Sequence, residues 1–503
     1  MSSVLGATLL GVDGFIVEVE VDISSQLPRI DIVGLPEAAV RESAARVRSA
    51  IRSSGHRFPD RRITVNLAPA GLRKRGASLD LPIALGILAA DGQIETGQLE
   101  GRTFAGELAL DGRLRPVRGA LSLALAARSV RSSQLFLPAD CAAQAALAPE
   151  IDVRAAKDLL SVLAHLHGSE ELARAPGPRP TPFEGGDLPC LSEVRGQTVA
   201  KRALILAAAG GHALLLSGPP GSGKTMLARR LPGLLPPLEL EEALETTRIH
   251  DAAGLLEAGA AVRMQRPFRA PHHTASAAGL LGGGTTPAPG EASLAHCGVL
   301  FLDELPEFDR RVLEALREVS EEGRVRLARA AYHCIFPAQF QLVGACNPCP
   351  CGWYQGGVRD CRCDDGAIAR YQRRLSGPLL DRIDLRVSLQ PVAWSDLDAS
   401  ANGPTTAEVR PLVESCRRLA QARGARCNAQ LPDPAVEAAT AASPEARRLL
   451  GQAVERLGIS ARAVRRALRV ARTCADLAEE EPISERSMAE ALSYQRTAPH
   501  GHR

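Results

Sequence analysis

Aromatic residues are scarce in this chain, and its charges nearly cancel. Phe, Tyr and Trp together make up 3% of the 503 residues, and the net charge is +3. So few aromatic rings exclude the extensive stacking platforms with which single-strand binders hold bases. Because the charge is balanced, the chain has no global basic field, and any contact with nucleic acid must come from a local patch.

Long apolar segments are also missing. The longest apolar run, residues 203–216, is interrupted at Gly210, Gly211 and His212, and it is shorter than the ~20 residues that span a bilayer. The N-terminus has neither the basic segment nor the small-residue cleavage site of a secretory signal. The 12 cysteines are too few for a disulfide scaffold. We therefore expect a soluble, cytoplasmic protein without a membrane partner.

Composition and a proline cluster predict the domain organisation. With 45% apolar and 23% charged residues, the chain is typical of a folded protein, and at ~150 residues per domain it suggests about three domains. Prolines at 176, 178, 180, 182 and 189 favour a stiff, extended linker. We predict an N-terminal unit over residues 1–167, a Pro-rich linker over 168–190, a central core over 191–391 and a helical region over 392–503.

The pattern of apolar residues predicts an α/β fold. Residues 15–23 alternate as a half-buried strand does, and residues 37–51 favour a helix. Shorter strand-like segments follow, so the N-terminal unit is α/β with mixed strand order. The core repeats strand, Gly-rich turn and helix, which is typical of a parallel sheet with crossover helices. Beyond it, the helical pattern predicts a C-terminal helical lid.

A complete GxxxxGK[ST] motif lies between a strand-like and a helix-like segment, which is the context the motif requires. Its glycines let backbone N–H groups face phosphates, Lys224 supplies positive charge at the β- and γ-phosphates, and Thr225 supplies a hydroxyl for Mg²⁺. A Gly-rich turn with a chance lysine is the alternative. The predicted ATP-binding loop consists of Gly218, Pro219, Pro220, Gly221, Ser222, Gly223, Lys224 and Thr225.

Two adjacent acids end a second apolar segment, residues 299–302. We predict that Asp303 holds Mg²⁺ together with Thr225, and that Glu304 polarises the attacking water as general base. The alternative is that the two acids cap the next helix. Combined with the phosphate loop, they predict ATP hydrolysis.

Three further polar residues are candidates for reading the γ-phosphate. Asn347 ends a third strand-like segment and is a candidate sensor that orients water. Arg382 is a candidate finger inserted into the site of a neighbouring subunit, or else a salt-bridge partner of Asp381 or Asp384. Arg462 opens a predicted helix whose arginines share one face. It is the candidate second sensor, and the other arginines face solvent, phosphates or a subunit interface.

Several long stretches carry a resemblance that covers nearly the whole chain. They are RPFRAPHHTAS (266–276), PGEASLAHCGVLFLDELPEF (289–308), CNPCPCG (346–352), SGPLLDRIDL (376–385) and SARAVRRALRVARTCADL (460–477). With these stretches the chain resembles the ComM/YifB family of Mg-chelatase-like AAA+ ATPases. The resemblance implies a homo-hexamer that uses ATP and Mg²⁺ on single-stranded or branched DNA. It further implies a helicase that promotes branch migration as incoming strands integrate during natural transformation.

Residues 1–167 are similar to the Lon-protease-like domain, which has a ribosomal S5 domain 2-like fold. The similarity lies in residues 74–80 and 106–117. It puts Ser78 at the position of the family's nucleophile, but Leu123 stands where the family carries its general-base lysine. Because a serine without its base is not activated, we expect a catalytically inactive domain, used for DNA binding or ring formation.

Two basic segments are candidates for DNA contact. Residues 61–62 and 73–75 give the N-terminal unit a local basic patch, although such patches are more often solvated surface. Residues 323–329 alternate and predict a β-hairpin that carries Arg324 and Arg326. In MCM-like relatives a hairpin at this place touches DNA in the pore of the ring.

The segment 266–284 contains Arg269, His272, His273 and a run of glycines. A flexible basic loop of this kind fits a pore loop that grips the phosphate backbone. The alternative is a structural insertion whose histidines bond to backbone, and a metal role for the histidines ranks below both.

Four clustered cysteines form a candidate zinc site. CxC pairs are less typical of zinc than CxxC, and Cys346 with Cys349 forms a CxxC that offers a substitute ligand. Free thiols are the other alternative. The candidate ligands are Cys349, Cys351, Cys361 and Cys363.

Two other functions stand as alternatives to a DNA motor. One is a magnesium-chelatase-like motor subunit, against which stands the absence of a DxSxS metal-adhesion motif. The nearest approach, residues 22–26 (DISSQ), breaks at its last position. The other is an AAA+ protein remodeller. Dependence of the ATPase rate on DNA separates these functions from a DNA motor.

Overall fold

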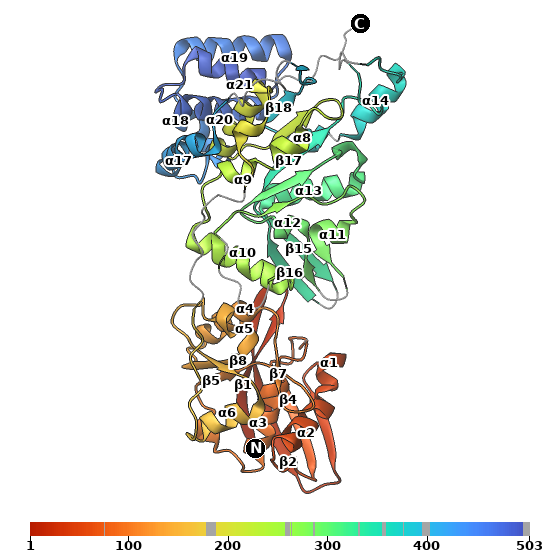
Figure 1. The fold of residues 1–503 in the computed structure, drawn as a ribbon, viewed down its shortest axis with the longest axis vertical. Helices are drawn as coiled ribbons and strands as arrows, with labels where there is room; N and C mark the ends of the chain where they lie inside the picture. The colour runs from red at the N-terminus through yellow and green to blue at the C-terminus, as the bar shows by residue number, and fades with distance from the viewer. Residues whose placement is uncertain are drawn as a thin grey trace.

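Three units follow one another along the long axis of the molecule (Figure 1). An α/β unit holds the N-terminus at one end, a second α/β unit forms the middle, and a helical lid lies beside the far end of the middle unit. Residue 75 of the predicted basic patch and residues 178–187 of the predicted linker lie outside the described residues. The computed structural model describes all residues except 75, 178–187, 257–261, 263, 285–286, 330–331, 355–358, 376, 395–402 and 496–503.

The N-terminal unit is built on a seven-stranded mixed sheet in the order β3-β4-β2-β1-β5-β8-β9. Val17, Val19 and Val21 are fully buried, while the residues between them are exposed or half-buried. The strand predicted over residues 15–23 is thereby confirmed. The strands of this sheet are β1 (Ser2–Leu10), β2 (Asp13–Ser24), β3 (Arg29–Val33), β4 (Arg62–Ala68), β5 (Arg102–Phe104), β8 (Gln134–Pro138) and β9 (Asp152–Ala156).

Six helices and a short ribbon, β6 (Glu107–Leu108) with β7 (Leu114–Arg115), accompany this sheet. The helix predicted over residues 37–51 forms as two helices that meet at Glu42. Ser43 is buried and donates to the carboxylate of Asp80, which fixes where the second of them starts. The helices are α1 (Ala38–Arg41), α2 (Ser43–Ser53), α3 (Asp80–Ala90), α4 (Ala120–Ser129), α5 (Ala139–Ala145) and α6 (Leu159–Leu166).

The chain stays on this sheet beyond α6. Ala175 N–H donates to Val153 O at 2.8 Å, and Leu172 and Ala175 are buried. The first residues of the predicted linker therefore pack as part of the N-terminal unit.

The middle unit contains a five-stranded sheet in the order β11-β14-β17-β10-β18, and all of its neighbouring strands are parallel. The parallel sheet predicted from the sequence is thus confirmed. Leu214 and Leu216 face one apolar cluster with the lid, whereas Leu215 faces a second cluster on the other side of the sheet. The strands are β10 (Leu214–Ser217), β11 (Phe268–Arg269), β14 (Val299–Leu302), β17 (Gln341–Cys346) and β18 (Leu385–Ser388).

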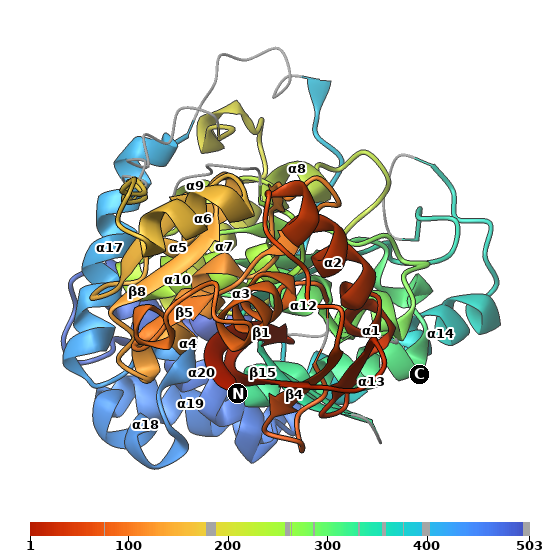
Figure 2. The same ribbon diagram turned by 90° about the horizontal axis from the view of Figure 1, so that it is seen from below.

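Short helices and two small ribbons surround this sheet. The ribbons are β12 (Gly282–Gly283) with β13 (Ala288–Pro289), and β15 (Arg324–Arg329) with β16 (Tyr332–Pro337). Seen along the long axis, α14 lies on the opposite side of the molecule from the lid (Figure 2). The helices are α7 (Thr198–Gly210), α8 (Lys224–Ala228), α9 (Leu231–Leu234), α10 (Leu240–Ala252), α11 (Ala277–Leu281), α12 (Glu291–Leu294), α13 (Arg310–Glu322), α14 (Asp365–Arg374) and α15 (Gly377–Leu380).

Helices are the main regular elements of the lid among its described residues, as the sequence predicts. Each of its two longest helices begins at a hydroxyl cap, Thr405 for α17 and Ser460 for α20. Val470 and Ala471 of α20 join the apolar cluster that includes α7 and β10. The helices are α17 (Thr406–Ala422), α18 (Asp433–Ala439), α19 (Pro444–Leu457), α20 (Ala461–Leu477) and α21 (Glu485–Ser493).

Helix α10 joins the N-terminal unit to the core. The carboxylate of Asp251 accepts from the backbone N–H groups of Gly119 (3.2 Å) and Leu121 (3.4 Å), at the N-terminus of α4. One turn earlier, Arg248 donates to Asp13 (2.8 Å) and to the carbonyl of Val12. Burial raises the pKa of Asp251, whereas these N–H donors act in the opposite direction. A side chain of the core therefore caps a helix of the N-terminal unit.

Within the described residues, no helix combines the length and the apolar character required to cross a bilayer.

Candidate active site

The phosphate loop connects β10 to α8. Gly221 (φ +78°) and Gly223 (φ +92°) take the left-handed conformation that favours glycine. A Cβ atom on either residue would meet no atom within 4 Å, so this side of the loop is open. The glycines therefore leave room for a ligand against the backbone, directly before a helix N-terminus.

The Lys224 ammonium group lies inside the bend of this loop. It donates to the carbonyls of Gly218 (2.7 Å) and Pro219 (2.9 Å), and to Asn347 Oδ1 (3.1 Å). Burial lowers the pKa of Lys224, and the nearby carboxylate of Asp303 opposes that shift. Two predicted site residues that are 123 positions apart in the chain are thus in direct contact.

A hydroxyl and a carboxylate meet beside the lysine. Thr225 Oγ1 donates to Asp303 Oδ2 at 2.8 Å. Asp303 follows β14, Asn347 follows β17, and the phosphate loop follows β10. These three strands are adjacent and parallel, so the predicted residues gather at one edge of the sheet. Oxygen donors of this kind suit Mg²⁺.

Glu304 directly follows this carboxylate and takes the left-handed conformation (φ +50°). Its side chain is 54% exposed, and its Oε2 lies 3.2 Å from Nδ1 of His273. His272 packs ring to ring on His273 at 4.1 Å and bonds to Thr274. Sequence reasoning missed the pair of His273 with Glu304, because no motif links a loop histidine to an acid 31 residues later.

The structure does not bring Arg382 to the phosphate loop. Its guanidinium group forms an ion pair with Glu321 of α13, with Nε 2.9 Å from the carboxylate. Among the described residues, Arg382 forms no ion pair with the alternative partners Asp381 and Asp384; Asp384 accepts from His212 (3.3 Å) and from the N–H of Ala213. Arg382 lines a cleft of about 940 Å³ between the core and the lid.

Helix α20 braces the turn that carries Arg382. Arg466 of this helix donates to the carbonyls of Leu380 (3.2 Å), Asp381 (2.7 Å) and Ile383 (3.0 Å). Arg462, at the start of the same helix, is exposed. Within the described residues, no hydrogen bond or ion pair joins Arg462 to the phosphate loop.

The other arginines of α20 are expected to face solvent, phosphates or another subunit; Arg469 and Arg472 are mostly buried, whereas Arg465 is 43% exposed. Arg469 donates to the carbonyl of Leu431 and to Asp433 (2.7 Å), and Arg465 pairs with the same Asp433. Arg472 is 1% exposed and donates to Asp476, one turn further along the helix. Their acceptors come from the lid itself, which the spacing of arginines along one helix does not reveal.

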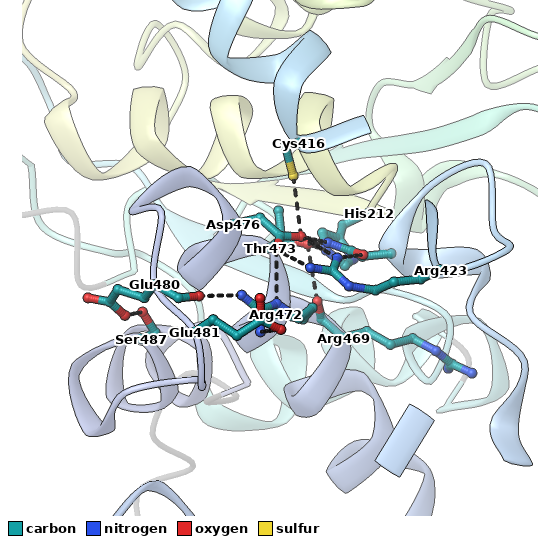
Figure 3. A network of polar contacts seen from close by, with 11 residues as sticks. His212, Cys416, Arg423, Arg469, Arg472, Thr473, Asp476, Glu480, Glu481 and Ser487 are labelled. Carbon is teal, nitrogen blue, oxygen red and sulfur yellow. Dashed lines mark hydrogen bonds and ion pairs between the residues drawn. The ribbon is translucent and has the colours of Figure 1, made fainter. Parts of the chain in front are cut away.

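Figure 3 shows the polar network that includes Arg472 and Asp476. The carboxylate of Asp476 is 1% exposed and accepts from Arg472 (2.9 Å) and from both terminal nitrogens of Arg423 (2.7 and 2.8 Å). Beside it, Thr473 bonds to Nε2 of His212 at 2.8 Å. Since His212 precedes β10 and also contacts Asp384, the network connects the lid to the strand before the phosphate loop.

Among the described residues, no side-chain base is hydrogen-bonded to Ser78, the serine of the N-terminal unit that is expected to be inactive. Ser78 donates to the backbone carbonyl of Ala7 at 3.0 Å, and Leu123 is fully buried. Lys74 is buried and donates to the carbonyls of Gly34 (3.0 Å) and Pro69. The serine therefore serves the fold as a hydrogen-bond donor.

Ion pairs compensate much of the basic patch predicted in the N-terminal unit. Arg61 pairs with Asp91 and Arg62 with Asp31, at 3.1 and 3.0 Å. Because Lys74 is also buried, these residues do not form a continuous basic surface.

The two predicted DNA-contact segments of the core have different environments. β15 and β16 form the predicted hairpin, in which Arg324 is 50% and Arg326 is 60% exposed, both beside Glu322. In the loop 266–284, by contrast, Arg269 makes a two-point ion pair with Glu291 (2.6 and 2.7 Å). Arg269 therefore serves the structure of the insertion.

Three comparisons with known families cover most of the chain. Residues 190–397 match the family described as magnesium chelatase, subunit ChlI. Residues 19–141 match subunit ChlI of Mg-chelatase, and residues 403–495 match the ChlI C-terminal family. Together with the parallel sheet, the phosphate loop and the helical lid, these matches define a Mg-chelatase-like AAA+ protein.

Relatives of similar length identify the family within this class. The chain is 44% identical to competence protein ComM of Haemophilus influenzae over 489 residues, which are 96% of this chain and 95% of ComM. It is also 44% identical to YifB of Escherichia coli over 490 residues, 96% and 95% of the two chains. The chain belongs to the ComM/YifB family. It is 29% identical to the magnesium-chelatase 67 kDa subunit of Heliobacterium mobile, over 39% of this chain and 30% of that subunit.

Proposed function

We propose that this chain is an ATP-hydrolysing DNA motor that works as a homo-hexamer in the cytoplasm. Its proposed task is branch migration by helicase action, while DNA is integrated in natural transformation or recombination. The observation that carries the proposal is the meeting of Lys224, Thr225, Asp303, Glu304 and Asn347 at one edge of a parallel sheet. The name of the relative ComM supports the competence role.

The family implies ATP with Mg²⁺, and the donor set fits both. The open face of Gly221 and Gly223 leaves room for phosphates, and Lys224 supplies positive charge there. Thr225 and Asp303 present oxygen ligands that would hold Mg²⁺. When bound, the ion neutralises charge on the phosphates; the remaining chemistry belongs to the chain's own side chains.

Two side chains act on the attacking water in this proposal. Glu304 is half-exposed at the open side of the site and accepts the proton of the water as general base. Asn347 orients the water, while its contact with Lys224 fixes its own position.

In the proposed ring, a neighbouring subunit supplies a further positive charge to each nucleotide site. In the part of the chain that the structure describes, no hydrogen bond or ion pair joins Arg382 to its own phosphate loop, which fits a finger that reaches the site of the next subunit. Arg462 is exposed at the start of α20 and serves as second sensor. Each subunit would then complete its neighbour's site, as coordinated hydrolysis around a ring requires.

We place DNA against the hairpin β15–β16. Arg324 and Arg326 are the exposed cations there, and phosphate contacts by such arginines need no base reading. The N-terminal unit, residues 1–167, is an inactive Lon-like module, and residues 168–190 link it to the ATPase core (191–391) and lid (392–503).

Two alternative functions remain, and one of them has a specific observation in its favour. Similarity to a magnesium-chelatase subunit favours a motor for metal insertion, although it covers only 39% of this chain. A protein remodeller would use the same nucleotide site with another substrate.

The test measures phosphate release over a concentration series, with no DNA, with single-stranded DNA and with a branched junction. We expect the junction to stimulate hydrolysis, and we expect Lys224→Ala to abolish nucleotide binding. An unchanged hydrolysis rate with every DNA, together with stimulation by a protein partner, would show that the chain is a protein remodeller and not a DNA motor. Light scattering over the same concentration series measures whether the chain assembles into a hexamer.

A further inference from the structure

The four clustered thiols point at one another. The Sγ atoms of Cys349, Cys351, Cys361 and Cys363 all lie within 4.8 Å of one another. Cys349 Sγ is 3.4 Å from Cys351 Sγ and 3.7 Å from Cys361 Sγ, and the last two are 3.6 Å apart. A disulfide would need about 2.05 Å. These separations therefore belong to thiols that surround a common centre.

The separations agree with one particular geometry. Four thiolates at about 2.3 Å from a zinc ion, in a tetrahedron, lie about 3.8 Å from one another. The three separations among Cys349, Cys351 and Cys361 fall within 0.4 Å of that value, and Cys363 Sγ lies within 4.8 Å of each of the other sulfurs. Thiolates prefer zinc to Mg²⁺, which takes oxygen ligands. In addition, the N–H of Tyr354 donates to Cys349 Sγ at 3.3 Å, the kind of second contact that stabilises a metal-bound thiolate.

The alternative ligand Cys346 lies outside this group. It ends β17, is buried, and is not one of the four residues whose sulfurs converge. The two CxC pairs therefore supply the complete set, and a closed set of four thiolates leaves no open position for catalysis.

The cysteine loop also contacts the nucleotide site. Cys349 follows the candidate sensor Asn347 by two residues. Gly352 packs so tightly on Pro220 of the phosphate loop that a Cβ atom there would lie 2.6 Å from the proline ring, and 3.8 Å from Asn347 Cγ. With φ +84°, Gly352 also requires glycine's conformational freedom. The loop thus touches both the sensor and the phosphate loop.

We propose that Cys349, Cys351, Cys361 and Cys363 bind one zinc ion, and that the metal-bound loop holds Asn347 and Pro220 in place for the nucleotide. The zinc site stands on the sulfur geometry alone. Its second role rests on the proposed ATPase function, because it concerns the position of residues that would read the phosphates.

The first experiment measures metal content of the full chain, purified without chelator, by atomic emission. We expect one zinc per chain, a loss of zinc in Cys361→Ser, and retention in the control Cys190→Ser. Cys190 is a half-buried free thiol outside the cluster. Replacement of zinc by cobalt should give the intense absorption of tetrahedral cobalt thiolate. Wild-type protein without stoichiometric zinc, or equal zinc in both variants, overturns the site.

The second experiment titrates a fluorescent ATP analogue and records affinity. We expect Cys361→Ser to bind it about tenfold more weakly, a change of about 1.4 kcal/mol, because the loop no longer restrains Asn347 and Pro220. Cys363→His is the conservative control, since a Cys₃His set still binds zinc, and it should retain both zinc and affinity. If Cys361→Ser does not fold, the zinc-free wild type takes its place. Chelation of the wild type and readdition of zinc should lower and restore affinity.

The two proposals fail in different ways. Lys224→Ala should lose the nucleotide and keep its zinc. A wild-type chain that holds zinc but never binds nucleotide refutes the ATPase while the metal site stands. A chain that binds nucleotide equally with and without zinc refutes the positioning role, and a wild-type chain purified without chelator that contains no zinc refutes the site itself.

Discussion

Two clusters of charged side chains differ in how completely their members are paired. At the phosphate loop, Glu304 is 54% exposed, and a hydroxyl and a carboxylate face each other beside open glycines. In the lid, Asp476 and Arg472 are each 1% exposed, and Asp476 accepts from two arginines and an amide. The first cluster has polar atoms left for a ligand, whereas the second uses its carboxylate within the fold.

This difference separates residues that are available for chemistry from residues that stabilise the fold. Burying a charge is costly unless it is paired and hydrogen-bonded, and the lid meets that requirement because Arg423, Asn428 and Arg472 donate to Asp476. Exposed groups at the sheet edge need no such compensation and remain available to phosphate and water. We therefore expect substitutions in the first cluster to change activity without stability, and those in the second to change stability first.

Glu304→Gln should give the largest change in activity. The amide cannot take a proton from water, so hydrolysis should fall by about 10²- to 10⁴-fold, while nucleotide affinity and melting temperature stay near those of the wild type. Phosphate release and calorimetry measure the two effects. The control is Glu307→Gln, an exposed acid that pairs with Arg374. Normal turnover in Glu304→Gln would remove this residue as the base.

Asp476→Ala should produce the opposite pattern. Removal of this carboxylate leaves Arg423 and Arg472 buried without their partner, which costs about 3–5 kcal/mol of unfolding free energy. The matched control is Asp433→Ala, whose 53% exposed side chain also pairs with two arginines; there we expect about 0–1 kcal/mol. Denaturant unfolding compares the two. Equal losses would mean that burial does not distinguish the clusters.

Arg382→Ala tests a residue that belongs to neither cluster. Its turn is braced by Arg466 of the lid, yet its proposed target is a neighbour's phosphate. Loss of one such donor should lower hydrolysis by about 10²- to 10³-fold. Mixing this variant with Lys224→Ala should restore part of the activity, since each supplies what the other lacks. The exposed Arg310 provides an alanine control; a mixture that stays inactive argues against a finger acting in trans.

The two clusters also differ in how well the sequence predicts them. The phosphate loop, Asp303 and Asn347 were predictable because each stands at the end of a strand-like segment, and parallel strands end at one edge. The partners of the α20 arginines were not predictable, because Arg466 donates to carbonyls that lie 83 to 86 residues away in the chain. Helical spacing assigns a face but does not identify what packs against it.

Contacts between segments far apart in the chain were equally hidden. Neither the pair of Arg382 with Glu321 nor the contact of Gly352 with Pro220 has a motif, since both depend on how loops pack in three dimensions. The cysteine cluster was partly predictable. Its residue types indicated a metal site, but the unusual spacing did not decide between Cys346 and the other cysteines as ligands. The sulfur positions make that choice.

His273→Ala should have the smallest effect, and it tests how available Glu304 is within the cluster at the phosphate loop. His273 is the one contact that partly satisfies Glu304 among the described ion pairs, at 3.2 Å. Such a bond occupies an oxygen of the carboxylate and is worth ~1 kcal/mol, so its removal should raise the DNA-free hydrolysis rate about fivefold. Because the loop 266–284 carries this histidine, DNA stimulation should shrink by a similar factor. His272→Ala, whose ring bonds to Thr274, should leave both rates unchanged. Equal behaviour of the two variants would show that Glu304 is as free in the folded chain as its exposure suggests.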